Sequence, residues 1–147
     1  MAGVLFDSSI YITAIRARSG ALQALRGLIA ETATWLSSVV LEELYAGAIR
    51  SNRDLVEELE ENFNRAQRIL VPIQSDWTEA GKLLARLAAK YGYEQIGRGR
   101  LTNDALIAIS SARAGITLLT SNARDFNRLA EFSHFNWRVA NSVNQSR

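Results

Sequence analysis

The sequence predicts an α/β fold with a mainly parallel central sheet. Short apolar segments, which are typical of buried strands, alternate with longer segments that repeat hydrophobic residues at helical spacing. This alternation runs from end to end, without an internal repeat, a low-complexity tract or a linker. A chain of 147 residues can bury one sizeable core, so we expect a single domain over residues 1–147.

Five apolar segments are predicted to be strands. They cover residues 4–6, 34–38, 70–73, 116–119 and 135–139. Amphipathic segments between them predict the helices. The first helix begins at residue 8, and another begins at residue 104. The others cover residues 21–29, 39–47, 54–69, 76–91 and 123–130.

Several boundaries and faces follow from individual residues. Gly20 is expected to separate the first two helices, and Pro72, the only proline, suits a strand end. Residues 92–100, which contain the sequence GRGR, are expected to form a loop. The helix over residues 54–69 presents an apolar stripe of Leu55, Leu59, Phe63, Ala66 and Ile69. The three tryptophans, Trp35, Trp77 and Trp137, are expected to pack in the core.

The composition excludes several classes of protein. No run approaches the roughly 18 apolar residues of a membrane span, and the N-terminus does not resemble a signal peptide. Without cysteine the chain has no disulfide or thiolate metal site, which suits the cytoplasm. The single histidine, His134, makes a His-rich zinc site or a serine triad improbable, and a surface or structural role is expected for it.

The basic residues are nearly all arginine. Only Lys82 and Lys90 are lysines among the 17 basic residues. Arginine suits bidentate recognition of phosphate, although it also serves as ordinary surface charge. The composition therefore favours nucleic acid only weakly.

Polar side chains follow the predicted strands. Asp7 comes directly after the first strand, Glu43 a few residues after the second, and Asn122 and Asp125 after the fourth, while Asp104 opens the helix before it. The carboxyl ends of parallel strands form the usual ligand site of such a sheet. Carboxylates that converge on one point repel one another unless a cation lies between them, and Mg²⁺ and Mn²⁺ are cations that oxygen ligands suit. A helix N-terminus would also favour the ionised form of Asp104.

Each acid also has a structural alternative. Asp7 is placed to cap the first helix, and Asp104 and Asp125 are placed as ordinary first-turn acids. Glu43 lies in an unusually apolar segment, which favours a site, whereas its neighbour Glu42 is expected at the surface. The residues alone leave these alternatives open.

Three segments in this order, FDSSI, ELYAG and NDALIAISSARAGITLLTSNARDF, resemble the PIN-domain family, and more narrowly its VapC-type toxins of toxin–antitoxin systems. The resemblance spans residues 4 to about 139. It implies a three-layer α/β/α sandwich whose acids bind Mg²⁺ or Mn²⁺ and cleave RNA. By position, the metal ligands are Asp7, Glu43 and Asp104.

The fourth acidic position departs from the family pattern. Asn122 stands where many members have aspartate, and Asp125, three residues later, is the expected compensation. Asn122 keeps a carbonyl that orients a water or ligand but removes one charge. We therefore expect one well-held metal ion instead of a tight pair, with Asn122 and Asp125 completing the catalytic site.

Other residues are predicted to contact the substrate. Arg98 and Arg100, before Asp104, are candidates for binding RNA phosphates, with a solvated loop as the alternative. Ser9 and Thr120 are candidates for hydrogen bonds to a carboxylate or phosphate.

The resulting functional hypothesis is an Mg²⁺- or Mn²⁺-dependent endoribonuclease, the toxin of a toxin–antitoxin pair. The alternatives are a binding module of the same fold with weakened catalysis, or a nuclease in DNA or RNA processing. The resemblance also implies a homodimer and a cognate antitoxin that occupies a groove along the early helices. Apolar residues there supply either that groove or the core; they are Ile10, Ile12, Leu22, Leu25, Leu44 and Tyr45.

Overall fold

The structure of the protein is a computed structural model that describes residues 3–17, 19–48, 50–96 and 100–140. Its described strands form a five-stranded sheet in the order β3-β2-β1-β4-β5, and every neighbouring pair is parallel. The strands are β1 (Val4–Phe6), β2 (Thr34–Ser37), β3 (Ile69–Leu70), β4 (Thr117–Thr120) and β5 (Trp137–Val139). All carboxyl ends of the strands therefore meet at one edge of the sheet.

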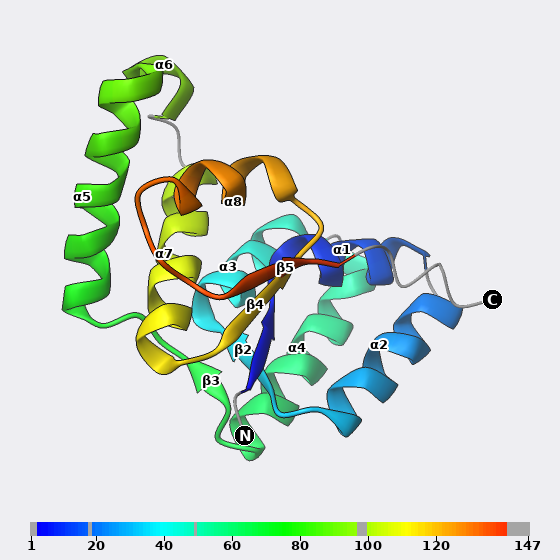
Figure 1. Ribbon diagram of the computed structural model, residues 1–147. Coiled ribbons are helices and arrows are strands. Elements are labelled where there is room, and N and C mark those ends of the chain that lie inside the picture. The colour runs from blue at the N-terminus through cyan, green and yellow to red at the C-terminus, as the bar shows by residue number, and fades with distance from the viewer. Residues whose placement is uncertain (1–2, 18, 49, 97–99, 141–147) are drawn as a thin grey trace.

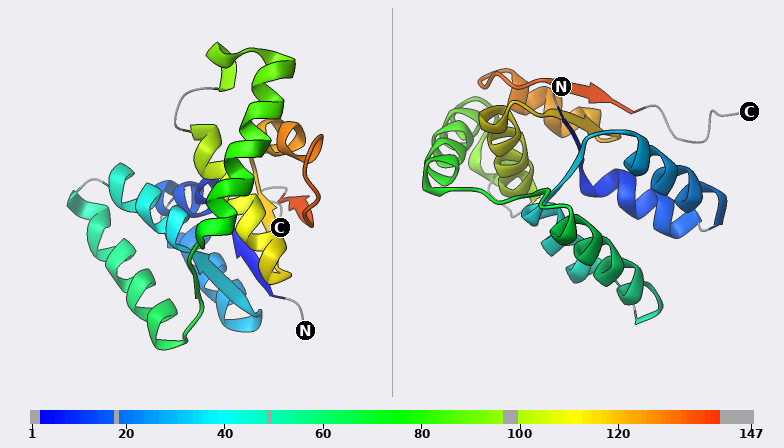
Figure 2. Two further views of the ribbon diagram at one scale, coloured as in Figure 1. Left: turned by 90° about the vertical axis from the view of Figure 1, so that its left-hand side faces the viewer. Right: turned by 90° about the horizontal axis from the view of Figure 1, so that it is seen from below.

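Helices connect the strands and cover both faces of the sheet (Figures 1 and 2). They are α1 (Ser8–Ala17), α2 (Ser19–Glu31), α3 (Ser38–Gly47), α4 (Arg50–Arg65), α5 (Gln74–Tyr91), α6 (Tyr93–Ile96), α7 (Arg100–Ala114) and α8 (Ala123–Ala130). Helices α5, α7 and α8 pack together on one side, and α1, α2 and α4 lie on the other. The predicted α/β/α sandwich with a parallel sheet is confirmed.

The core explains why β1 lies at the centre of the sheet. Its residues Leu5 and Phe6 are buried between β2 and β4, next to the fully buried Leu36 and Leu118. A strand buried on both faces reads as a continuous apolar run, which is the pattern of VLF before Asp7. Burial of such side chains contributes roughly 1.5–3 kcal/mol each.

The chain turns sharply between α7 and β4 at Gly115. Its φ of 70° lies in the left-handed region that favours glycine. The Ile116 N–H donates to the Ser111 carbonyl at 2.9 Å, and the Gly115 N–H donates to the Ala112 carbonyl at 3.1 Å. These two bonds form a Schellman motif, which ends α7 and leads directly into β4.

Several predicted boundaries are wrong. Gly20 lies inside α2 instead of between helices, and α4 runs from Arg50 to Arg65, four residues short of the predicted end at residue 69. Strand β3 is Ile69–Leu70, so Pro72 falls in the connection that follows it. The predicted loop over residues 92–100 contains α6.

The predicted buried faces also need correction. On α4 the buried residues are Val56 and Phe63, whereas Ala66 is exposed and lies beyond the helix. Trp77 is 57% exposed, so its predicted place in the core is wrong. Trp35 and Trp137 are partly buried against the core, as expected.

Within the described residues, no helix combines the length and apolar character that a membrane span requires.

Candidate active site

Asp7 lies at the carboxyl end of β1 with both side-chain oxygens hydrogen-bonded. Its Oδ1 accepts from the Ser9 backbone N–H at 3.0 Å and from the Ser9 hydroxyl. Its Oδ2 accepts from the Thr120 hydroxyl at 2.6 Å. The side chain is buried, and burial raises the pKa of Asp7, although the hydrogen bonds from Ser9 and Thr120 act in the opposite direction. The site therefore holds a desolvated carboxyl group in a fixed orientation.

Thr120 and Ser9 extend this network to the loop after β4. The Asn122 backbone N–H donates to the Thr120 hydroxyl at 2.8 Å, and the Ser121 N–H donates to the Ser9 hydroxyl at 3.2 Å. The Asn122 side-chain amide donates to Asp125 Oδ2 at 3.0 Å. Asp125 lies in the first turn of α8, directly after the cap position of Asn122. The polar residues that follow β1 and those that follow β4 were predicted to share one site. Although more than 100 positions separate them in the sequence, they are hydrogen-bonded to each other in the structure.

Glu43 reaches the same region from α3. That helix begins after Ser37, whose hydroxyl accepts from the Val39 N–H at 3.1 Å. Burial raises the pKa of Glu43, and the charges of Glu42 and Asp7 raise it further, while hydrogen bonds from Asn103 and Ser8 lower it. Glu43 lies in the second turn of α3.

Asp104 comes from α7, but not from its N-terminus. The helix begins at Arg100, which makes Asp104 its fifth residue and leaves the first turn without an acid. The predicted stabilisation by the helix dipole is therefore wrong, because that effect fades beyond the first turn. Asp104 is buried next to Ala105 and Ala108 on the face of α7 that meets the core.

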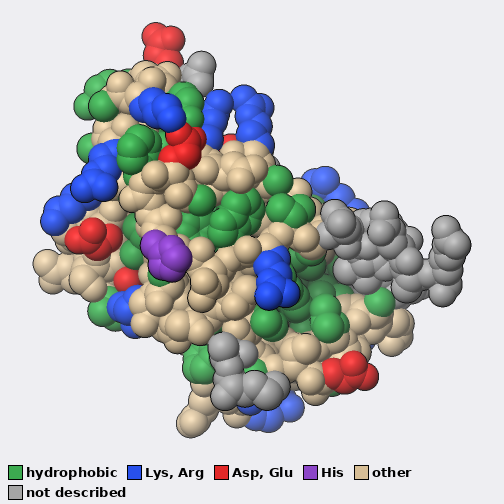
Figure 3. All heavy atoms as spheres, viewed as in Figure 1, with side chains coloured by type: hydrophobic (Ala, Val, Ile, Leu, Met, Phe, Trp, Pro, Cys, Tyr) green, Lys and Arg blue, Asp and Glu red, His purple; other side chains and the backbone are tan. Residues whose placement is uncertain are grey.

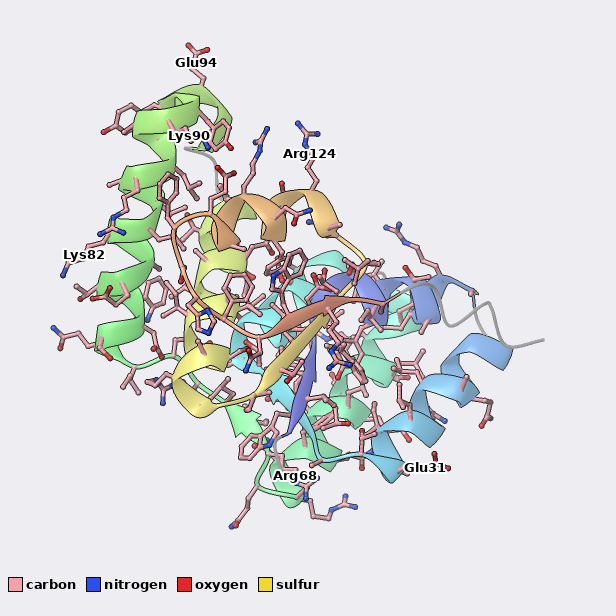
Figure 4. All side chains as sticks on the ribbon, in the orientation of Figure 1. Glu31, Arg68, Lys82, Lys90, Glu94 and Arg124 are labelled. Atoms are coloured by element: carbon pink, nitrogen blue, oxygen red, sulfur yellow. The ribbon has the colours of Figure 1, made fainter. Side chains whose placement is uncertain are left out.

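These groups line one depression of about 620 Å³, which we call the acidic cleft. Its lining residues are Asp7, Ser8, Ser9, Ile12, Glu42, Glu43, Ala46, Gly47, Asn103, Asp104, Asn122, Arg124 and Asp125. Five carboxyl groups face it, and among its described lining residues Arg124 is the only cation. Figure 4 shows the Arg124 side chain extending outward from α8, so it lies at the rim. The cleft is therefore strongly acidic.

The donor set of the acidic cleft suits a hard divalent cation. Carboxylate oxygens are the ligands that Mg²⁺ and Mn²⁺ prefer. One oxygen of Glu43 is buried and accepts no hydrogen bond from the part of the chain described, which leaves it available to a ligand. In those same ranges, however, no three acids are gathered tightly enough to form a ready-made metal site. The carboxylate ligands are therefore of the right kind for a cation, but they lie apart from one another along the cleft.

The predicted substrate contacts have different outcomes. Ser9 and Thr120 hydrogen bond to the Asp7 carboxylate, and their contact with substrate stays a prediction. Arg98 lies outside the described residues, and so does the side chain of Arg100, whose backbone begins α7. His134 is exposed, and its purple side chain is visible on the surface in Figure 3.

Three polar residues of the acidic cleft were missed by sequence reasoning: Ser8, Asn103 and Arg124. Ser8 and Asn103 hydrogen bond to Glu43 from α1 and α7, and Arg124 approaches from α8. The pair Asn103–Asp104 gave a signal, because both residues belong to the resembling segment NDALIAISS. Arg124 is the second residue of α8, and nothing in the sequence pattern sets it apart from the other arginines.

The sequence matches the family of PIN domains over residues 4–132. That match covers most of the chain, so the chain belongs to the PIN-domain family, whose members are nucleases. A comparison with curated proteins finds no significant match.

Solved structures of VapBC complexes share the fold. The DNA-bound VapBC from Salmonella typhimurium aligns with a TM-score of 0.67 and 22% identity, covering 95% of this chain and 98% of the other. VapBC2 from Rickettsia felis, bound to a promoter DNA fragment, aligns with a TM-score of 0.57 and 21% identity, covering 94% and 98%. VapBC-1 from nontypeable Haemophilus influenzae aligns with a TM-score of 0.60 and 19% identity, covering 92% and 96%. At these identities the likeness shows the fold.

Proposed function

We propose that the chain is a metal-dependent endoribonuclease and the toxin of a toxin–antitoxin pair. The observation that carries this proposal is the acidic cleft, where Asp7, Glu43 and Asp104 from three separate elements face one depression. Membership of a nuclease family and a fold shared with VapBC complexes support the same proposal.

In this proposal Asp7, Glu43 and Asp104 hold a Mg²⁺ or Mn²⁺ ion. The ion would supply Lewis-acid chemistry: it polarises a phosphodiester and promotes attack by water. Burial raises the pKa of both Asp7 and Glu43, so an incoming cation would relieve an existing cost of keeping them ionised. Asn122 and Asp125, hydrogen-bonded to each other, would orient a ligand at the far wall of the cleft.

RNA would need cationic groups around an acidic cleft. Arg124 at the rim is one such group, and Arg98 and Arg100 remain predicted contacts for phosphates. On the face seen in Figure 3, Lys and Arg side chains lie in separate groups instead of one compact patch. We therefore expect phosphate contacts to be few, and binding to show a shallow dependence on salt.

A cognate antitoxin and a homodimer belong to the same proposal, as does a cytoplasmic location. A narrow apolar cleft bounded by Ile12, Ile15, Leu44 and Val56 opens next to Glu43, between α1, α3 and α4. Its position supports a partner segment that would reach the acidic cleft. Of the residues predicted for such a groove, Ile10, Leu25 and Leu44 are buried in the core and Ile12 and Tyr45 are partly buried. The side chain of Leu22 lies outside the described part of the chain.

The experiment combines RNA cleavage with metal binding. A single-stranded RNA is incubated with the protein and Mn²⁺, with Mg²⁺, or with EDTA, and calorimetry follows Mn²⁺ binding without RNA. We expect cleavage with either ion and none with EDTA. A protein that binds no Mn²⁺ at millimolar concentration would instead support the alternative of a PIN-fold binding module. A protein that cuts DNA as well as RNA would support a role in nucleic-acid processing.

A further inference from the structure

A second cleft adjoins the acidic cleft and shares part of its wall. Glu42 and Asn103 line both. The second cleft has a volume of about 280 Å³. We call it the tryptophan cleft; its other lining residues are Ser38, Val39, Val71, Pro72, Trp77 and Leu106. The two clefts are therefore neighbours: the acidic cleft lies on one side of Glu42 and Asn103, and the more apolar tryptophan cleft lies on the other.

Large apolar side chains at the tryptophan cleft are exposed. Trp77 and Val71 are each 57% exposed, and the neighbouring Ile73 is 49% exposed. Packing of α5 does not require Trp77, since Ala80, Leu83 and Leu87 are side chains of that helix that enter the core. Clustered apolar groups with a few polar neighbours are typical of binding sites.

The charge of this cleft favours a base over a phosphate. Among its described lining residues there is no Lys or Arg, and Glu42 stands at its border, so a phosphate would be repelled. A neutral nucleobase carries no such penalty. The indole of Trp77 offers a flat stacking surface, while the Asn103 amide and the Ser38 hydroxyl offer hydrogen bonds to a base edge.

We propose that the tryptophan cleft binds one nucleobase of a single-stranded RNA, stacked on Trp77, while the neighbouring phosphate would be attracted to the acidic cleft by the divalent cation proposed there. The shared residues Glu42 and Asn103 place the two subsites side by side. This inference rests on the proposed function and adds a substrate subsite to it. A protein surface, including a second copy of the chain, is the competing occupant that the test must exclude.

The first test measures cleavage of a short single-stranded RNA with Mn²⁺ as a function of RNA concentration. Trp77→Ala should raise KM by about fivefold or more and change kcat little, since stacking contributes to binding. Trp77→Phe should stay within about twofold of the original KM, because a ring is retained. Trp77→Leu should resemble Trp77→Ala, because it keeps apolar area without a ring. Tyr93→Ala removes another exposed aromatic residue, outside both clefts, and should change nothing.

The second test removes the base instead of the indole. A series of RNA substrates carries one abasic nucleotide at successive positions around the cleaved bond. At one position the abasic substrate should raise the KM of the original protein by the same factor as Trp77→Ala. At that position Trp77→Ala should show no further loss, because both changes remove one interaction. Independent losses at every position would overturn the proposal.

The outcomes separate this inference from the proposed function. If the original protein cleaves RNA, Asp104→Asn does not, and Trp77→Ala has an unchanged KM, the subsite is refuted and the nuclease stands. If the original protein cleaves no RNA, both fail. If Trp77→Ala turns a dimer into a monomer in analytical ultracentrifugation while Trp77→Leu keeps both the dimer and the original KM, the cleft is a protein contact and the base-binding proposal is overturned.

Discussion

The Thr120 hydroxyl donates a hydrogen bond of 2.6 Å to Asp7 Oδ2 across 113 positions of sequence. The bond joins the carboxyl ends of β1 and β4, which are neighbours in the sheet. Thr120 is fully buried and also accepts from the Asn122 N–H at 2.8 Å. One hydroxyl therefore fixes both the first acid of the acidic cleft and the loop that carries its last polar residues.

Thr120→Val tests this bond through the pH dependence of cleavage. The Thr120 hydrogen bond lowers the pKa of Asp7 against the effect of burial, so its loss should raise that pKa further. The ionised form would then appear at higher pH, and the acidic limb of the kcat/KM profile should move upward. Stability should fall by about 1–3 kcal/mol, because a buried acceptor loses its donor. Thr117→Val on the same strand is the control; an unmoved acidic limb in Thr120→Val would contradict the account.

Glu43→Gln should make the metal-free protein more stable at neutral pH. Folding raises the pKa of Glu43 above its ordinary value of 4.5, mainly through burial. Ionisation of Glu43 therefore lowers the free energy of unfolding. This loss of stability is absent below about pH 4.5 and complete above the raised pKa. We expect the variant to melt about 2–4 °C higher at pH 7 and the difference to vanish as the pH falls toward 4.

The comparison for Glu43→Gln is the exposed Glu61 on α4, where Glu61→Gln should leave the melting temperature unchanged at both pH values. Added Mn²⁺ should then stabilise the original protein more than Glu43→Gln, since in the proposed site the ion would bind the folded state through this carboxylate. Equal stabilisation of the two proteins would show that Glu43 is not a ligand.

Much of the fold was predictable because buried parallel strands appear as continuous apolar runs. The segment before Asp7 and the segment over residues 117–120 both have this pattern, and both are strands at the centre of the sheet. The order of the strands in the sheet could not be predicted in this way. It depends on which face of the sheet each connecting helix covers, and a local sequence pattern carries no information about that.

The errors have physical causes. Thr102, Asn103 and Asp104 form a sequence typical of a helix start, but α7 begins at Arg100, because tertiary packing extends the helix beyond its local signal. Helical periodicity assigned Trp77 to the buried side of α5, yet periodicity cannot reveal that the neighbouring surface is left open. The contact of Asn103 with Glu43 joins α7 to α3 and has no local signature.

Gly3→Ala should destabilise the protein by about 1–3 kcal/mol through overpacking. A Cβ atom at Gly3 would lie 2.7 Å from Trp35 Cδ1 and 2.9 Å from the Ala33 carbonyl oxygen. The Trp35 indole is packed against the core, and the carbonyl belongs to the backbone that enters β2. In urea denaturation the control Gly27→Ala, in α2 with open space around it, should instead be neutral or stabilising. Similar midpoints for both variants would refute the close approach.

Asp76→Ala should cost about 1–3 kcal/mol, because it breaks an ion pair that is buried on the Asp76 side only and leaves the Ile73 N–H at the start of α5 without its acceptor. The Asp76 carboxylate is almost completely buried, accepts from Arg113 Nε at 3.0 Å and accepts from the Ile73 N–H at 2.9 Å. Glu79→Ala, which breaks an exposed pair with Lys82 on the same helix, should cost less than about 0.5 kcal/mol. Urea denaturation measures both; a loss below 1 kcal/mol for Asp76→Ala would mean that Arg113 and Ile73 find other partners.

We propose that the acids of the acidic cleft are jointly required for cleavage of RNA. The most direct measurement is the rate of cleavage of a single-stranded RNA with Mn²⁺ by Asp7→Asn and by Asp104→Asn, each shown to be folded by its melting curve. The control is Asp54→Asn, which changes an exposed acid on α4. We expect the control to keep the original rate and both cleft variants to lose at least about a hundredfold in rate. Cleavage by Asp7→Asn and Asp104→Asn at the original rate would contradict the proposal.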